Sequence, residues 1–262
     1  MEKLFVIKIG GNIIDDEIKL LSFIKDFAAI KANKILIHGG GKLATKVAEA
    51  MGIEQQMVDG RRITDAETLK IVTMVYAGYI NKNIVAGLQA AGCNAIGLCG
   101  ADANVMKAHK RAGAAIDYGF VGDIDAVNNV FIKSVLDNNN SIVFAPITHN
   151  AQGQLLNTNA DTVANEIAVA MKDYYEVTLI YCFEKDGVLM NANDDTSVIP
   201  SISKESFETL KSGNIISAGM IPKLDNAFAA VNAGVKQVII GNAEKLNTLI
   251  QYQTGTVISN EY

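Results

Sequence analysis

The sequence contains no tryptophan, only three histidines and three cysteines, and no long apolar run. The three cysteines are widely spaced and odd in number, which matches neither a disulfide framework nor a zinc site. Its apolar runs are far shorter than the ~20 residues of a membrane helix, and its N-terminus lacks a signal-peptide pattern. A net charge of −5 argues against a general nucleic-acid surface. We therefore expect a soluble cytoplasmic protein with no nucleic-acid or membrane partner.

The sequence does contain an alternation of short apolar runs and longer amphipathic segments. Near-continuous apolar runs predict strands that are buried on both faces. These predicted strands lie at 5–9, 34–37, 95–99, 141–145, 177–182 and 237–240, and the predicted helices at 15–31, 42–51, 66–91, 131–138 and after 161, 203 and 223. The segment 100–130 is broken by glycines and predicts hairpins instead. This order predicts an α/β fold with a largely parallel sheet that is covered on both faces.

Two glycine clusters each follow a predicted strand, at Gly10 and Gly11 and at 39–41. Loops at the carboxyl ends of parallel strands commonly bind ligands, and consecutive glycines let backbone N–H groups converge on an anion. The glycines could also serve only to permit tight turns from strand to helix. Neither cluster matches the P-loop or the dinucleotide-binding pattern, so both interpretations stay open.

Several charged side chains stand at unusual places. Lys8 interrupts an apolar strand, so either that strand is an edge or the ammonium points into an anion site. Lys223 stands at the start of a predicted helix, where its charge opposes the helix dipole. Asp161 follows Asn157 and Asn159 before another helix, and three such residues exceed what capping alone requires.

Arg61 and Arg62 precede Thr64, which we expect to cap a helix. Either arginine could clamp a carboxylate through two hydrogen bonds, or both could be ordinary surface residues. No histidine or cysteine stands in a nucleophile or metal-ligand pattern. Any metal would therefore be bound as a complex with a nucleotide.

Seven motifs, taken together and in order, resemble the amino acid kinase family. They are VIKIGGN at 6–12, ILIHGGG at 35–41, DGRRIT at 59–64, GLCGAD at 97–102, GFVGDI at 119–124, LLNTNADT at 155–162 and SAGMIPK at 217–223. The resemblance implies a three-layer α/β/α sandwich with an eight-stranded, mainly parallel sheet. Residues 1–172 would form an N-terminal lobe that binds an acylated amino acid and makes a homodimer. Residues 173–262 would form a C-terminal lobe that binds ATP.

The resemblance also implies a reaction, in which ATP phosphorylates the γ-carboxylate of N-acetyl-L-glutamate, or of a close N-acyl-glutamate, to an acyl phosphate in arginine biosynthesis. Such a carboxylate, with a pKa of ~4.3, is already ionised at pH 7 and needs no general base. Mg²⁺ would be carried by the ATP phosphates. Two alternatives stay open. One is a sibling kinase that acts on another carboxylate, such as an aminoadipate derivative, and the other is a non-catalytic nucleotide or amino acid sensor of the same fold.

Position within the motifs implies a role for each candidate residue. Lys8 and Lys223 would stabilise the transferring phosphoryl group, and Asp161 would hold these lysines in place. Gly11 would contribute a backbone donor. The acylated amino acid would be bound by Gly40, Gly41, Arg62 and Asn157. The residues on the ATP side would be Glu184, Lys185, Asp186, Gly187, Val188, Leu189, Ile215, Ile216 and Ser217.

The nucleotide loop departs from the usual pattern Thr-Asp-Val-x-Gly-Val. Glu184 stands in place of the aspartate and Lys185 in place of the apolar residue. Family members that are inhibited by arginine carry an extra N-terminal helix, whereas this sequence begins almost directly on its first strand. We therefore expect a homodimer that is insensitive to arginine.

Overall fold

A computed structural model of the protein describes residues 1–58, 61–113, 116–213, 215–216 and 220–260. Its centre is an eight-stranded sheet with the order β12 (Ser201–Ile202), β14 (Thr256–Ile258), β13 (Gln237–Asn242), β11 (Glu176–Phe183), β1 (Lys3–Ile9), β2 (Asn33–His38), β8 (Ser141–Phe144) and β5 (Ala95–Leu98). Neighbouring strands run parallel except β13 and β14, which are antiparallel. The predicted mainly parallel sheet is therefore confirmed.

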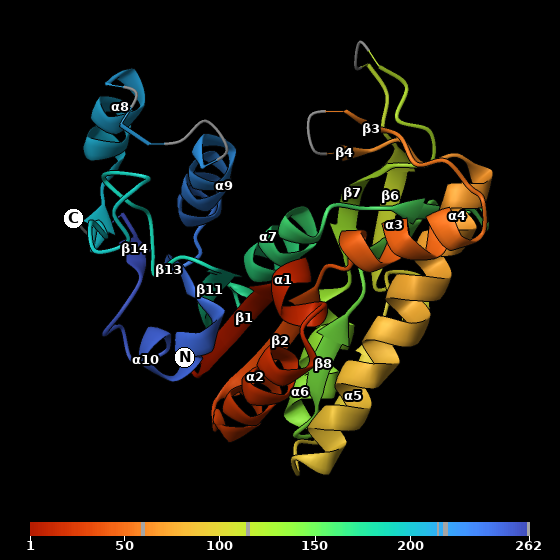
Figure 1. The fold of residues 1–262 in the computed structure, drawn as a ribbon. Helices are drawn as coiled ribbons and strands as arrows, with labels where there is room; N and C mark the ends of the chain where they lie inside the picture. Colours follow the sequence, from red (N-terminus) through yellow and green to blue (C-terminus); the bar gives the residue numbers. More distant parts are fainter. Residues whose placement is uncertain (59–60, 114–115, 214, 217–219, 261–262) are drawn as a thin grey trace.

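Helices cover both faces of this sheet (Figure 1). One face carries α6 (Asn129–Asp137), α7 (Ala160–Met171), α8 (Lys204–Ser212) and α9 (Ile221–Asn232). The other carries α2 (Glu17–Ala29), α3 (Gly41–Ala50), α4 (Ala66–Thr73), α5 (Asn81–Ala90) and α10 (Leu246–Leu249). Each face has its own hydrophobic core, because successive strand residues point to opposite sides of a sheet. The three-layer α/β/α sandwich is confirmed.

The predicted hairpins at 100–130 form part of a second, four-stranded sheet. Its order is β10 (Leu155–Asn157), β9 (Ile147–His149), β6 (Met106–Lys110) and β7 (Gly122–Val127). β6 and β7 pair antiparallel, as the glycine punctuation predicts. A short ribbon of β3 (Met57–Val58) and β4 (Arg61–Arg62) lies at the same end of the molecule (Figure 1).

The predicted helix cap at Thr64 is wrong, because Asp65 caps α4 instead. The Asp65 carboxylate accepts a hydrogen bond from the backbone N–H of Thr68 at 2.7 Å. The Thr64 hydroxyl donates to the Arg62 carbonyl and accepts from Asn157, which lies far away in the sequence. Both residue types can cap a helix, and a long-range contact decides between them here.

The predicted single helix at 66–91 is continuous but not uniform. A π-helical segment, η1 (Met74–Ile80), joins α4 to α5. Wider turns of this kind often occur next to functional sites. As for the membrane, the helices within the described residues are all too short or too polar to cross one.

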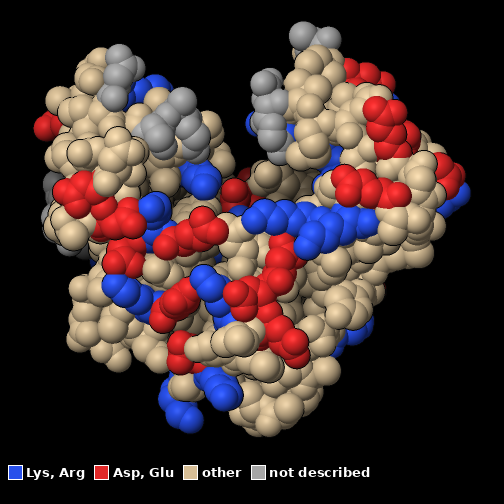
Figure 2. Space-filling model, in the orientation of Figure 1, with Lys and Arg blue, Asp and Glu red and all other residues tan. Residues whose placement is uncertain are grey.

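The molecule is hollowed between the part that carries α8 and α9 and the part that carries α3, β3 and β4 (Figures 1 and 2). The short helix α1 (Gly11–Ile14) follows β1 directly, and α3 follows β2 after a glycine turn. The predicted lobe boundary at residue 172 falls between α7 and β11. The division of labour between the two lobes stays a prediction.

Candidate functional site

Lys8 lies at the carboxyl end of β1, on the face covered by α7 and α9. Because side chains alternate in direction along a strand, Lys8 points to the same side of the sheet as Leu4 and Val6, which belong to the core on that face. β1 lies between β11 and β2, so the edge-strand interpretation is wrong. Lys8 is only 9% exposed, and its Nζ lies 2.7 Å from Oδ1 of Asp161 in the first turn of α7. Two elements that are far apart in the sequence therefore form an ion pair between a buried ammonium and a partly exposed carboxylate.

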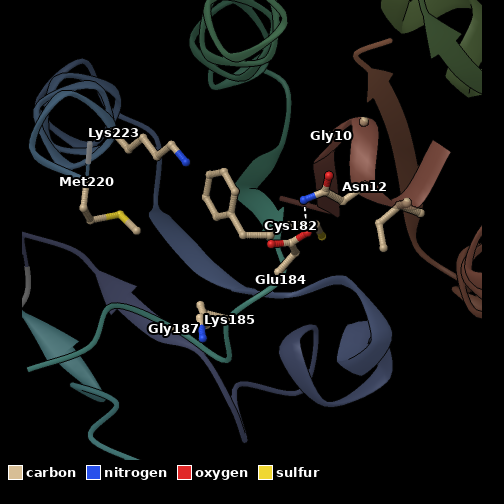
Figure 3. A pocket seen from close by; sticks show the side chains of 11 residues that line it. Gly10, Asn12, Cys182, Glu184, Lys185, Gly187, Met220 and Lys223 are labelled. Atoms are coloured by element: carbon tan, nitrogen blue, oxygen red, sulfur yellow. Dashed lines mark hydrogen bonds between the residues drawn. The ribbon is translucent and has the colours of Figure 1, made fainter. Parts of the chain in front are cut away.

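Lys223 reaches the same place from the first turn of α9, with its side chain extended into the cavity (Figure 3). Its Nζ lies 3.6 Å from the centroid of the Phe183 ring, and Nζ of Lys8 lies 5.7 Å from that centroid. Burial lowers the pKa of Lys223, as does the charge of Lys8, while Asp161 raises it. We call Lys8, Asp161 and Lys223 the lysine cluster, which carries two ammonium groups and one carboxylate.

A cavity of about 300 Å³ opens beside the lysine cluster at the carboxyl ends of β1 and β11 (Figure 3). It is lined by Gly10, Gly11, Asn12, Ile13, Cys182, Phe183, Glu184, Lys185, Gly187, Met220 and Lys223. The Asn12 amide donates a hydrogen bond to the Glu184 carboxylate, and the Lys42 ammonium donates to the Asn12 carbonyl oxygen. This chain of contacts joins the segments that follow β1, β2 and β11.

The second glycine cluster, residues 39–41, forms a tight turn that we call the glycine loop. Gly40 has a φ of 152°, and a Cβ at this position would collide with Cδ1 of Ile80 and lie 3.1 Å from the Tyr76 ring. The π-helical segment supplies both of these neighbours. Glycine is therefore required here for conformation and for space.

A neutral histidine supports the glycine loop through a hydrogen bond to its backbone. His38 is fully buried, and burial lowers its pKa to about 4. Its Nδ1 lies 2.8 Å from the Gly39 carbonyl oxygen and must donate to it, so Nε2 accepts from the Asn81 amide at 3.3 Å. Asn81 also donates to the Val143 carbonyl at 2.9 Å. The Lys82 ammonium donates to the Asn81 side-chain carbonyl oxygen at 3.0 Å, so both ring nitrogens of the neutral histidine and its Asn81 partner are paired.

Arg62 lies against the glycine loop and is 7% exposed. One guanidinium nitrogen donates to the Gly41 carbonyl at 2.8 Å and to the Thr45 hydroxyl at 2.9 Å, and another donates to the Gln55 side chain. All these partners are neutral, and in the described part of the chain no carboxylate lies within ion-pair distance of Arg62. The site therefore holds a positive charge that can meet an anionic ligand.

Asn157 is tied to Arg62 through Thr64. Its side-chain amide donates to the Thr64 hydroxyl at 3.0 Å, and that hydroxyl in turn donates to the Arg62 carbonyl at 3.2 Å. The structure thus brings together Gly40, Gly41, Arg62 and Asn157, as their predicted common role requires. That role itself stays a prediction.

The predicted ATP residues separate into two groups. Glu184, Lys185 and Gly187 line the cavity. The Asp186 carboxylate is instead held by Lys245 at 2.6 Å and by Asn242 at 3.1 Å. Val188 is buried, Leu189 forms an isolated bridge with Val198, Ile215 is exposed and Ile216 is buried. Ser217 lies outside the described residues.

Sequence reasoning missed Phe183 and Tyr181. Tyr181 is the register partner of Lys8, and its hydroxyl donates to the backbone carbonyl of Asp161 at 3.2 Å. Phe183 lies two residues further along β11, on the same face, and its ring stacks on Tyr181 with centroids 6.4 Å apart. The two-residue period was the available signal, because it places both rings beside Lys8 once the two strands are paired.

Comparison with known proteins gives a consistent result. The model of the "Amino acid kinase family" matches residues 3–242. A protein of Cytophaga hutchinsonii named acetylglutamate kinase is 59% identical over 95% of this chain and 95% of its own length. One of the same name from Parabacteroides distasonis is 56% identical over 94% of this chain and 97% of its own.

A solved protein of Streptococcus mutans UA159 superposes with a TM-score of 0.79 at 29% identity, and covers 99% of both chains. The likeness thus extends over sequence and fold alike, and the range matched by the family model spans the lysine cluster. This chain belongs to the amino acid kinase family.

Proposed function

We propose that this chain transfers the γ-phosphoryl group of ATP to the γ-carboxylate of N-acetyl-L-glutamate, or of a close N-acyl-glutamate, to give an acyl phosphate in arginine biosynthesis. The observation that carries the proposal is the lysine cluster, which faces a cavity at the carboxyl ends of β1 and β11. Relatives named acetylglutamate kinase, at 59% and 56% identity, support the choice of substrate.

The chemical obstacle is electrostatic, because a carboxylate must approach a polyanionic phosphate. The acceptor is ionised at neutral pH, so no side chain has to remove a proton from it. Lys8 and Lys223 supply positive charge where charge develops on the transferring group, and Gly11 supplies a backbone N–H. Asp161 holds Lys8 in place and leaves the cluster with a net positive charge.

On the amino acid side, Arg62 binds the α-carboxylate. Its guanidinium is always charged and is already fixed by three neutral partners, so little conformational entropy is lost when a ligand binds. The backbone N–H groups of Gly40 and Gly41 and the Asn157 amide face the rest of the acylated amino acid. The N-terminal lobe, residues 1–172, thus binds the acceptor.

On the nucleotide side, residues 173–262 bind ATP, with Glu184, Lys185 and Gly187 at the cavity wall. Mg²⁺ carried by the ATP phosphates would supply further positive charge. Glu184, whose carboxylate accepts from Asn12 at the cavity wall, is the residue that would hold the ion through water.

We also infer that two copies of the chain associate through the β5 edge. β5 ends the sheet, and its Ile96 is 38% exposed. On the π-helical segment that leads into α5, the helix packed against β5, Met74 and Tyr79 are 53% and 65% exposed. An unpaired strand edge beside exposed apolar side chains favours pairing with a second copy. Sedimentation of the wild type should give a dimer and Tyr79→Glu a monomer, and a monomeric wild type would overturn this inference.

A single assay tests the proposed reaction. The protein is incubated with ATP, Mg²⁺ and a panel of N-acyl-glutamates and aminoadipates, and hydroxylamine traps any acyl phosphate as a hydroxamate. We expect product with N-acetyl-L-glutamate. If only an aminoadipate derivative gives product, the chain is a sibling kinase that acts on that carboxylate. No hydroxamate from any acceptor would reject the kinase proposal in favour of a sensor.

A further inference from the structure

The ring of Phe183 lies near both ammonium groups of the lysine cluster. The Lys223 Nζ lies 3.6 Å from its centroid and the Lys8 Nζ 5.7 Å. Both distances fall within the ~6 Å over which the face of an aromatic ring attracts a cation. Phe183 ends β11 and stacks on Tyr181 with an interplanar angle of 25°, so strand and stacking together fix the ring.

The two lysines differ in their other partners. Lys8 has Asp161 at 2.7 Å, whereas within the described ranges no carboxylate comes within ion-pair distance of Lys223. Lys223 is also half-buried and faces the like charge of Lys8. A lysine side chain in this situation gains stability by losing its proton or by swinging into solvent. The charge of Asp161 opposes the loss of the proton from beyond ion-pair distance, and the ring face is the attractive partner in direct contact with the ammonium.

We propose that Phe183 is a positioning residue, which keeps the Lys223 ammonium charged and directed into the cavity through a cation–π contact. The inference rests on the proposed function, in which Lys223 meets the transferring phosphoryl group. Phe183 touches no reacting atom and acts through Lys223. The ring adds no formal negative charge, so it holds the ammonium without competing with the phosphate as a carboxylate would.

Fluorinated phenylalanines at position 183 test this contact. Each added fluorine weakens the negative face of the ring and leaves its size nearly unchanged. We expect kcat to fall in steps from phenylalanine through 4-fluoro- and 3,5-difluoro- to 3,4,5-trifluorophenylalanine, by about fivefold overall, with a smaller change in the KM for ATP. The alkaline limb of the kcat profile should move to lower pH along the same series.

Phe207 provides a matched control. It is a buried ring in the same lobe, stacks on Phe228 and lies 5.4 Å from the ammonium of Lys211, away from the cavity. The same fluorinated series at Phe207 should leave kcat unchanged. A flat kcat series at position 183, or equal losses at both positions, would overturn the proposal.

A second measurement does not depend on turnover. With ¹³Cε-labelled lysine, the Lys223 resonance is assigned by its absence in Lys223→Met and titrated across the fluorinated series. A titration midpoint that falls step by step supports the contact, and a constant midpoint contradicts it. If the wild type forms no hydroxamate, the proposed reaction fails, and this titration still decides on Phe183.

Discussion

The glycine loop and the lysine cluster lie at the ends of neighbouring strands, yet they differ in how their polar and charged groups are paired. Beneath the glycine loop, His38 is neutral and both its ring nitrogens are paired. In the lysine cluster, one ammonium group pairs with the Asp161 carboxylate, and both ammonium groups lie near one aromatic ring. The glycine loop is thus supported by a neutral histidine and carries one cation, Arg62, held by neutral partners, while the lysine cluster places two cations beside a single carboxylate.

This difference shows what each side has to achieve. A loop that presents backbone N–H groups must be rigid, and buried neutral hydrogen bonds give rigidity at little cost in desolvation. A site that meets a developing anion needs charge that is not already neutralised. Substitutions in the lysine cluster should therefore change mainly kcat. Substitutions beneath the glycine loop should change mainly the free energy of unfolding.

The largest effect is expected for Lys223→Ala. Loss of one preorganised cation should lower kcat by about 10²–10³-fold. The free energy of unfolding should change by less than about 1 kcal/mol, because Lys223 is not paired in an ion pair within the described residues. Steady-state kinetics and urea unfolding measure the two quantities. Lys211→Ala on α8 is the control, and a loss of kcat below tenfold at Lys223 would contradict the assigned role.

Next in size is the pH dependence that arises from His38. Its folded pKa of about 4 lies below the ordinary value, so the unfolded chain binds more protons between these two values. This contribution to stability is complete above pH ~6.5 and is lost as the pH falls towards 4, by up to about 3 kcal/mol. Urea unfolding from pH 4.5 to 7.5 should show that the free energy of unfolding falls less steeply towards acid pH, the acid limb of the profile, for His38→Gln than for the wild type. His109→Gln, at an exposed histidine, should leave that limb unchanged, and equal limbs for all three proteins would show that His38 is not the source.

A smaller effect is expected for Arg62→Lys. A lysine keeps the charge but loses the planar fork, so the KM for the acylated glutamate should rise about tenfold. The value of kcat should change much less, because Arg62 contacts the glycine loop and not the lysine cluster. Arg61→Lys, at the exposed neighbour, serves as the matched control. An unchanged KM in Arg62→Lys would remove Arg62 from the acceptor site.

The smallest effect is expected for Lys185→Ala, although this residue lines the cavity. Its ammonium pairs with Asp195 at 2.6 Å in an exposed position, and such pairs contribute only about 0–1 kcal/mol. The KM for ATP should therefore change by less than about threefold. Asp195→Ala breaks the same pair from the other side and should match it. A tenfold rise in Lys185→Ala alone would assign Lys185 a direct nucleotide contact.

Much of the fold and part of the site followed from the sequence. Continuous apolar runs predicted strands buried on both faces, and the resemblance to the amino acid kinase family implied that Lys8, Asp161 and Lys223 belong to one site. For Lys8 the residues alone left two alternatives, since a lysine in a strand can face solvent or a ligand. Only strand order decides this, and order depends on pairing between segments far apart in the chain.

Other features depend on contacts that no local pattern encodes. Phe183 acquires its role only when the end of β11 meets the start of α9. The ionisation state of His38 depends on complete burial under helices from elsewhere in the chain. Asp65 caps α4, whereas the Thr64 backbone pairs with Tyr118 and Phe120 from a distant part of the chain. The expected insensitivity to arginine stays a prediction.

The π-helical segment has a consequence for how this protein can change length. A π turn holds one residue more than the matching α turn, so a one-residue deletion within Met74–Ile80 would restore regular α geometry. Because the wide turns absorb the extra residue, the helix after it would keep nearly the same rotation, and Ile84 and Leu88 would stay in the core. The same deletion would withdraw Tyr76 and Ile80 from Gly40. Insertions and deletions should therefore be tolerated in surface loops during divergence and rejected within this stretch of helix.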